Sequence, residues 1–151
     1  MYKKLIAKTL LVIALSFPVF AHAQDESYKE EDIDLEYRLC KLKDSSVSNI
    51  CDCAFIAYDK WNKQLDAAEK RLDKLLKEEN RLQLKKSDTS WMAYKDQEFT
   101  LFDYIYSKQG NYWCTLRQDS RIDVIKTRTI QLRNYFEAIR IGDEKRLLEK
   151  K

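Results

Sequence analysis

Histidine, proline and glycine are nearly absent from this chain of 151 residues, which holds one histidine, one proline and two glycines. Histidine is the side chain most often used for acid–base catalysis near neutral pH, and it is a common metal ligand. Proline and glycine are the residues that most readily interrupt helices. His22 and Pro18 both lie in the first 23 residues. We therefore expect the rest of the chain to be helical, not to be an enzyme, and to need no metal or cofactor.

Residues 1–23 have the pattern of a secretory signal peptide. Three lysines precede an apolar run over residues 10–20, and small residues suited to a signal peptidase follow it (Lys3, Lys4, Lys8; Ala21, Ala23). The apolar run is too short to span a bilayer comfortably. We expect cleavage after Ala23, no stable membrane insertion afterwards, and a mature protein in the periplasm or outside the cell.

The excess of basic residues comes from this signal segment. The chain has 28 Lys and Arg against 25 Asp and Glu, and three of the lysines precede residue 10. The remaining chain is electrically balanced, whereas nucleic-acid binding requires uncompensated cations along one face. We expect a protein partner and no nucleic acid; the sequence leaves self-association open.

Residues 24–44 open with an acidic block. Up to Glu36 it carries seven acidic residues against Lys29 alone (Asp25, Glu26, Glu30, Glu31, Asp32, Asp34, Glu36). Such blocks usually stay solvated, although they also steer basic partners. We expect an acidic N-terminal arm outside the folded core.

Three amphipathic segments follow in residues 45–141, each with apolar residues three or four positions apart. The first is expected to begin at an N-cap among residues 44–46 and to reach about Lys77. The second follows a break near residues 78–81, with Asn80 as a candidate cap, and ends near Lys108. The alternative is a single bent helix through residues 78–81. Their apolar positions are Val47, Cys51, Ala54, Tyr58, Trp61, Leu65, Ala68, Leu72 and Leu75, then Leu84, Trp91, Tyr94, Leu101, Phe102 and Ile105.

The third segment follows the turn at Gly110, and its stripe comprises Ile122, Ile125, Thr129, Leu132, Phe136 and Ile139. We expect Gly142 to end this helix and residues 142–151 to form a charged tail. Three helices with short connections predict an all-α, antiparallel three-helix bundle.

The four cysteines, Cys40, Cys51, Cys53 and Cys114, are an even number in a chain expected to be exported. Two disulfides are the natural interpretation in an oxidising compartment. Zinc binding is the competing one, but Cys51 and Cys53 lack the usual gap of about two to four residues. Because residues two apart on a helix face nearly opposite ways, these two cysteines do not bond to each other.

Several motifs occur in this order along the helical region. Cys53-Ala54 is followed by Tyr58 and Leu65, then Leu84 by Trp91, Tyr94, Lys95 and Asp96, and finally Arg128 by Leu132. This pattern resembles the LprI-like lysozyme inhibitor family, small exported proteins of bacteria. Lys95 stands where that family has arginine. The resemblance covers most of the chain after the signal segment.

The resemblance also implies a disulfide pairing. This chain has Phe99 and Ser120 where the family has two further cysteines, and losing both together is expected if they bond to each other. Cys40 and Cys53 resemble the family's other pair, which leaves Cys51 for Cys114. In an up-down-up bundle the starts of the first and third helices meet, which agrees with that second bond. The chief alternative is Cys40 with Cys51.

Asp96 and Arg128 lie at similar distances on either side of the turn at Gly110. We expect them to form an ion pair beside Trp91 and Tyr94 that fixes the register of the second and third helices. The two aromatic residues and Trp61 are expected to lie in the core rather than to bind a ligand.

By resemblance, the expected function is to block a lysozyme. The candidate binding element is the turn between the second and third helices, where amphipathic side chains are concentrated: Tyr104, Tyr106, Lys108, Gln109, Asn111, Tyr112 and Trp113. Tyrosine and tryptophan are typical anchors of binding hot spots. The alternatives are that these aromatic residues only cap the bundle, and that the protein is an envelope interaction or immunity-type protein whose partner is not a lysozyme.

Overall fold

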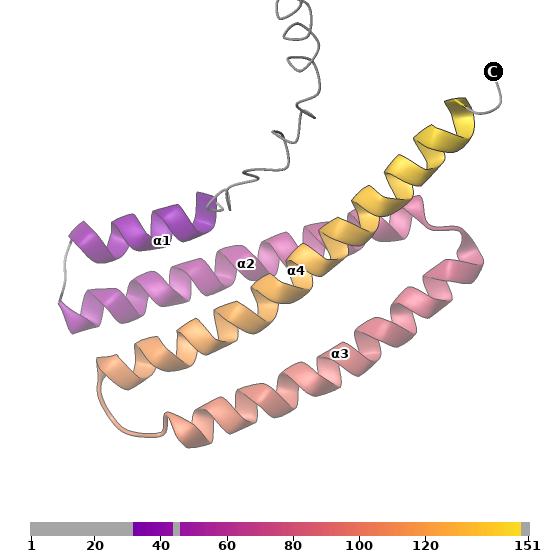
Figure 1. The fold of residues 1–151 in the computed structure, drawn as a ribbon. Helices are drawn as coiled ribbons and strands as arrows, with labels where there is room; N and C mark the ends of the chain where they lie inside the picture. Colours follow the sequence, from indigo (N-terminus) through magenta and orange to yellow (C-terminus); the bar gives the residue numbers. More distant parts are fainter. Residues whose placement is uncertain (1–31, 44–45, 149–151) are drawn as a thin grey trace, which may run out of the picture. The chain divides into compact units, whose positions relative to one another are not determined.

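The computed structural model describes residues 32–43 and 46–148, and every regular element in them is an α-helix. The helices are α1 (Asp32–Lys43), α2 (Val47–Leu75), α3 (Glu78–Ile105) and α4 (Asn111–Leu148) (Figure 1). The expected signal segment 1–23 and residues 24–31 of the acidic arm lie outside the described residues. The expectation of an all-α fold is met in the described residues, but with four helices instead of three.

The core is formed by α2 and α4, which share the most extensive helix interface. They run parallel, because Cys51 near the start of α2 bonds to Cys114 near the start of α4. The buried apolar cluster comes from these two helices alone: Ala57, Trp61, Leu65, Ala68, Leu72, Ile122, Ile125 and Leu132. All eight belong to the predicted apolar stripes of α2 and α4 or lie beside them, so helical periodicity identified these two faces correctly. The stripe predicted for α3 was not a core face, because none of its residues is buried.

Helix α3 returns antiparallel to α4 but packs loosely, and none of its residues is buried. Its contacts with α4 include long charged side chains: Arg121 Nη2 lies 2.7 Å from Asp103 Oδ1, and Arg117 Nε lies 3.7 Å from the same atom. Such side chains keep helix backbones further apart than small apolar residues do. The expected bundle of three helices is therefore corrected in the described residues: two helices form the core, flanked by α1 and α3.

Residues 32–43 of the expected acidic arm form α1, which packs antiparallel against α2. This segment also contains a short apolar stripe, since Ile33, Tyr37 and Cys40 are four and three residues apart. The prediction considered only its charge and missed this helical spacing. Ile33 and Tyr37 pack against the core. A solvated arm was thus the wrong interpretation for this part of the segment.

The helix ends differ from the expectations at two places. Helix α2 ends at Leu75 because Leu76 and Lys77 are extended, and Asn80 lies inside α3 rather than capping it. Helix α4 continues through Gly142 to Leu148, so the expected tail does not begin at Gly142. A single glycine costs a helix only about 1 kcal/mol, which the residues around it offset. The N-cap at Ser46 is confirmed: its hydroxyl accepts from the Asn49 N–H at 3.4 Å.

None of the described helices combines the length and the apolar character that a membrane-spanning segment needs.

Candidate functional site

Two disulfides hold one end of the helical unit. Cys40 of α1 bonds to Cys53 of α2, and Cys51 of α2 bonds to Cys114 of α4, with Cα–Cα distances of 5.9 and 5.8 Å. This is the pairing that the resemblance implied. The cystines leave no cysteine free. Because Cys114 is four residues from Gly110, the second bond anchors the turn between α3 and α4 directly to α2.

That turn is short and its backbone is well supported. Helix α3 ends where the Tyr106 N–H donates to the Phe102 carbonyl at 2.9 Å. Gly110 then has φ +111°, a conformation that side chains beyond glycine rarely adopt. Its carbonyl accepts from the Cys114 N–H at 3.2 Å, which begins α4. The turn predicted at Gly110 is therefore present, with α3 ending a few residues before the expected position.

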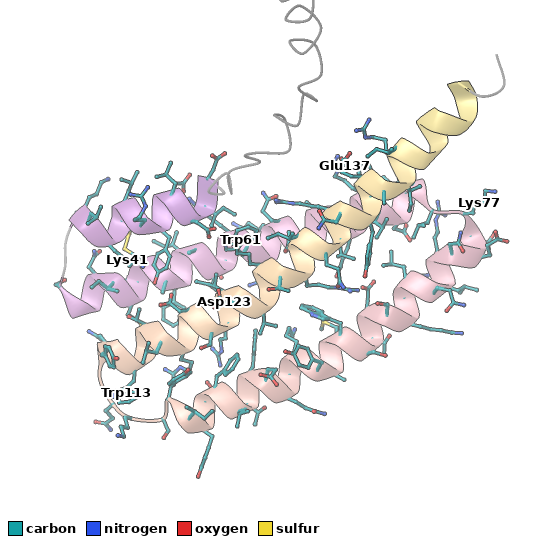
Figure 2. All side chains as sticks on the ribbon, viewed as in Figure 1. Lys41, Trp61, Lys77, Trp113, Asp123 and Glu137 are labelled. Atoms are coloured by element: carbon teal, nitrogen blue, oxygen red, sulfur yellow. A yellow bond between two sulfur atoms is a disulfide. The ribbon has the colours of Figure 1, made fainter. Side chains whose placement is uncertain are left out.

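Aromatic rings connect this turn to the interior of the helical unit. Centroid distances of 6.2 to 6.5 Å link successive rings of Tyr58, Phe99, Phe102, Tyr106 and Trp113. The inner rings are packed between helices, so they support the outer ones. Figure 2 shows Trp113 at the turn, on the first residues of α4.

At the outer end of this series the side chains face solvent. Tyr112 is 61% exposed and meets the Trp113 ring edge to face at a centroid distance of 5.4 Å. Lys108 places its ammonium 4.8 Å from the Trp113 ring centroid, and Gln109 and Asn111 are also exposed. The turn thus presents a polar and aromatic surface on a rigid base.

The cluster around Arg128 differs from the expected ion pair. Arg128 is only 5% exposed, and its Nη2 donates to Asp88 Oδ1 at 2.6 Å and to Ser87 Oγ at 3.1 Å. Asp96 is 69% exposed and pairs with Lys95 at 3.4 Å. The expected Asp96–Arg128 pair is therefore wrong. The prediction from equal distance to the turn assumed two straight, closely packed helices. Because α3 contacts α4 only loosely, the residue that meets Arg128 is Asp88, about two helical turns nearer the start of α3 than Asp96.

Glu69 lies close to this cluster. Its burial, followed by the carboxylates of Asp88 and Asp66, raises the pKa of Glu69, and the Arg128 guanidinium opposes the shift. Arg128 thus balances more than one acidic group in the space between α2, α3 and α4.

The motif aromatics divide between interior and surface. Trp61 is fully buried, as expected, and its indole donates to Asp34 Oδ1 of α1 at 3.1 Å. Trp91 is half-buried, with Lys95 and Arg128 each 5.8 Å from its ring centroid. Tyr94 is 51% exposed, so its assignment to the core was wrong.

Polar contacts between α1 and α4 were not foreseen from the sequence. Asp34 also forms an ion pair with Lys126, and the Tyr37 hydroxyl donates to Asp119 Oδ1 at 2.7 Å. Burial, and then the hydrogen bond to Asp119, raise the pKa of the Tyr37 hydroxyl. Burial and the nearby Asp119 likewise raise the pKa of Asp123, against the pull of Lys126. These pairs join residues more than 80 positions apart, beyond the reach of periodicity.

In the described residues, no group of His, Cys, Asp and Glu is placed to hold a metal ion. Their arrangement suits the binding of a macromolecule: a disulfide-anchored turn with exposed aromatic side chains.

Comparison with known proteins agrees with this description. No curated protein matches the sequence significantly. The chain is similar to an uncharacterized protein from Burkholderia thailandensis whose crystal structure has been solved, with 26% identity and a TM-score of 0.65. That match covers 72% of this chain but spans only 55% of the other. The family model described as "Lysozyme inhibitor LprI" matches residues 40–132, which is more than half of the sequence. This chain belongs to the LprI lysozyme inhibitor family.

Proposed function

We propose that this protein is exported to the periplasm or secreted, and that it binds a peptidoglycan-cleaving muramidase and blocks its cleft without catalysing a reaction itself. Family membership supports the class of partner, because the family is described by lysozyme inhibition. The observation that carries the binding site is the turn between α3 and α4, where exposed Tyr112 and Lys108 surround Trp113.

The chemistry of this turn suits the proposed target. Muramidases act with a pair of carboxyl groups in a cleft that accommodates sugar rings. Tyr112 offers an aromatic face of the kind that fills such a cleft, and the Lys108 ammonium is a counter-charge for a carboxylate. Gln109 and Asn111 add amide groups that both donate and accept hydrogen bonds. An inhibitor of this kind needs only to fill the cleft and satisfy its polar groups.

The support beneath the turn favours tight binding. The Cys51–Cys114 disulfide and the rings of Phe102 and Tyr106 hold the turn before any partner arrives. A binding element that is already ordered loses less conformational entropy on association. Reduction of the disulfide should therefore weaken inhibition even if the helices remain folded.

The test is a turbidity assay of cell-wall lysis with purified protein and lysozymes of different structural types. The Tyr112→Ala variant should weaken inhibition about tenfold or more, because aromatic anchors at the centre of an interface commonly contribute that much. Ile141→Ala is the matched control, since Ile141 is also an exposed apolar residue on α4 but lies far along the helix from the turn. Its inhibition should equal that of the parent protein.

Two outcomes would overturn the proposal. If the parent protein inhibits no lysozyme, the target is wrong, and recovery of a different effector from envelope extract would favour an immunity-type or envelope interaction protein instead. If Ile141→Ala weakens inhibition as much as Tyr112→Ala does, the binding surface is not the turn.

A further inference from the structure

A second surface lies between α3 and α4, away from the turn. It has no part in the lysozyme inhibition proposed above. It is a hollow of about 370 Å³ between Trp91 and Tyr94 of α3 and five residues of α4, which are Asp123, Val124, Thr127, Arg128 and Gln131. Pockets for small ligands and sugars commonly have volumes of a few hundred Å³. The hollow exists because α3 packs loosely on α4.

The polar atoms of this lining have unused hydrogen-bonding capacity. Gln131 accepts from Arg128 Nη1 at 2.7 Å through its carbonyl oxygen, and no described residue accepts from its amide NH₂ group. The indole N–H of Trp91 and the hydroxyl groups of Tyr94 and Thr127 likewise have no partner in the described part of the chain. Even the buried Nε of Arg128 lacks an acceptor. These groups are mostly donors, although the hydroxyl groups also accept, and the Asp123 carboxylate in the same lining adds an acceptor.

The residues that line the hollow include one basic and one acidic side chain, Arg128 and Asp123. The one cation among the lining residues, Arg128, is already paired with Asp88 at 2.6 Å. A phosphate-bearing ligand would require cations that are not engaged elsewhere. Neutral amides and hydroxyl groups beside an exposed tyrosine ring are instead suited to pyranose sugars, which present hydroxyl and acetamido groups at their edges and apolar C–H faces to aromatic rings.

A second hollow lies near the first, and the two share no lining residue. Arg128 lines the first hollow, and its Nη2 donates to Oγ of Ser87, which lines a neighbouring hollow of about 390 Å³. That second hollow is lined by apolar residues, Tyr135 and the polar side chains of Asn80, Gln83 and Ser87. Each hollow has one exposed tyrosine, Tyr94 (51% exposed) in the first and Tyr135 (47%) in the second. Two neighbouring hollows of this kind suit a chain of several sugar rings rather than a single ring.

We propose that the groove between α3 and α4 binds a neutral, unbranched oligosaccharide of N-acetylated hexosamines, with one ring stacked on Tyr94 and its acetamido and hydroxyl groups bonded by Trp91, Thr127 and Gln131. This site is separate from the turn, so the same protein binds glycan and protein partner on different surfaces. The inference does not depend on lysozyme inhibition.

The probe is tetra-N-acetylchitotetraose, titrated into the full protein while the tryptophan indole N–H signals are followed by NMR. The three tryptophans give separate readouts: the Trp91 signal should shift on saturation, whereas Trp61, buried and bonded to Asp34, and Trp113, at the turn, should not. The Tyr94→Ala variant should bind about tenfold more weakly, because it removes the stacking ring. Gln131→Ala should also weaken binding, and an unchanged helical circular dichroism spectrum shows that each variant is folded.

Two variants with opposite effects separate this proposal from the proposed function. Tyr94→Ala should lose glycan binding and keep lysozyme inhibition, whereas Tyr112→Ala should keep glycan binding and lose inhibition. Absence of saturable shifts in the parent protein would overturn the glycan site, as would binding that Tyr94→Ala leaves unchanged or shifts confined to Trp113. These three outcomes of the glycan titration would leave the proposal that the turn inhibits a lysozyme unaffected.

Discussion

The partner of Arg128 provides the sharpest test of the helix register. Replacing Asp88 with Asn removes the charge that lies 2.6 Å from Arg128 Nη2, while the guanidinium stays 95% buried with only neutral acceptors at Ser87 and Gln131. Removing a hydrogen bond to a charged group, or one partner of a buried ion pair, typically costs a few kcal/mol. We therefore expect Asp88→Asn to lower the unfolding free energy by about 2 to 3 kcal/mol. The partial exposure of Asp88 keeps the loss from being larger.

Asp96→Asn is the matched control on the same helix. Asp96 is mostly exposed and pairs only with its neighbour Lys95, so its replacement should change the unfolding free energy by no more than about 0.5 kcal/mol. Thermal unfolding followed by circular dichroism measures both variants. For a domain of this size, the Asp88 variant should melt roughly 5 to 15 °C lower than the parent protein.

A double-mutant cycle isolates the pair itself. In an Arg128→Met background, Asp88→Asn should cost much less than in the parent protein, because its partner has gone. The reasoning is refuted if Asp96→Asn destabilises the protein as much as Asp88→Asn, or if the cost of Asp88→Asn is the same with and without Arg128. Either result would show that the Asp88–Arg128 pair does not fix the register of α3 and α4.

Three further predictions concern a disulfide, a titrating group and the core. Replacing Cys51 and Cys114 with serine should lower the unfolding free energy by about 4 kcal/mol, since the bond closes a loop of 63 residues. Urea denaturation measures this loss, and an unchanged midpoint of the unfolding curve would disprove it. Folding raises the pKa of Glu69, so the native state holds this proton more tightly and stability falls as the pH rises above the usual carboxyl range. Glu69→Gln should therefore stabilise the protein at pH 7 and lose that advantage in acid; melting curves at several pH values test this, and a pH-independent difference would argue against it. Leu132→Ala should cost about 2 to 5 kcal/mol because its side chain is fully buried, whereas the exposed Leu82→Ala should cost at most about 0.5 kcal/mol; similar losses in chemical denaturation would mean that α3 is part of the core.

Local patterns in the sequence predicted three of the four helices and the buried faces of α2 and α4, but not the helix α1. The apolar stripe through Trp61, Leu65 and Leu72 predicted the buried face of α2 because helical periodicity is set by backbone geometry alone. The turn at Gly110 followed from the conformational freedom of glycine. The same kind of signal was present in α1 but was outweighed by its acidic composition.

Local patterns did not predict which side chains meet between helices that are far apart in the sequence. The choice of Asp88 over Asp96 depends on how far apart α3 and α4 lie, and that distance is set by several long side chains acting together. The attachment of α1 through Asp34 and Tyr37 depends on where α4 presents Lys126 and Asp119.

By itself, the sequence determined which segments are helical, where they turn and which faces are apolar, because these properties depend on neighbours within a few residues. Only the tertiary structure decided that two helices form the core, that a third packs loosely enough to leave a groove, and which charges meet. Those outcomes depend on the balance of packing, desolvation and side-chain length across the whole helical unit, which no local pattern contains.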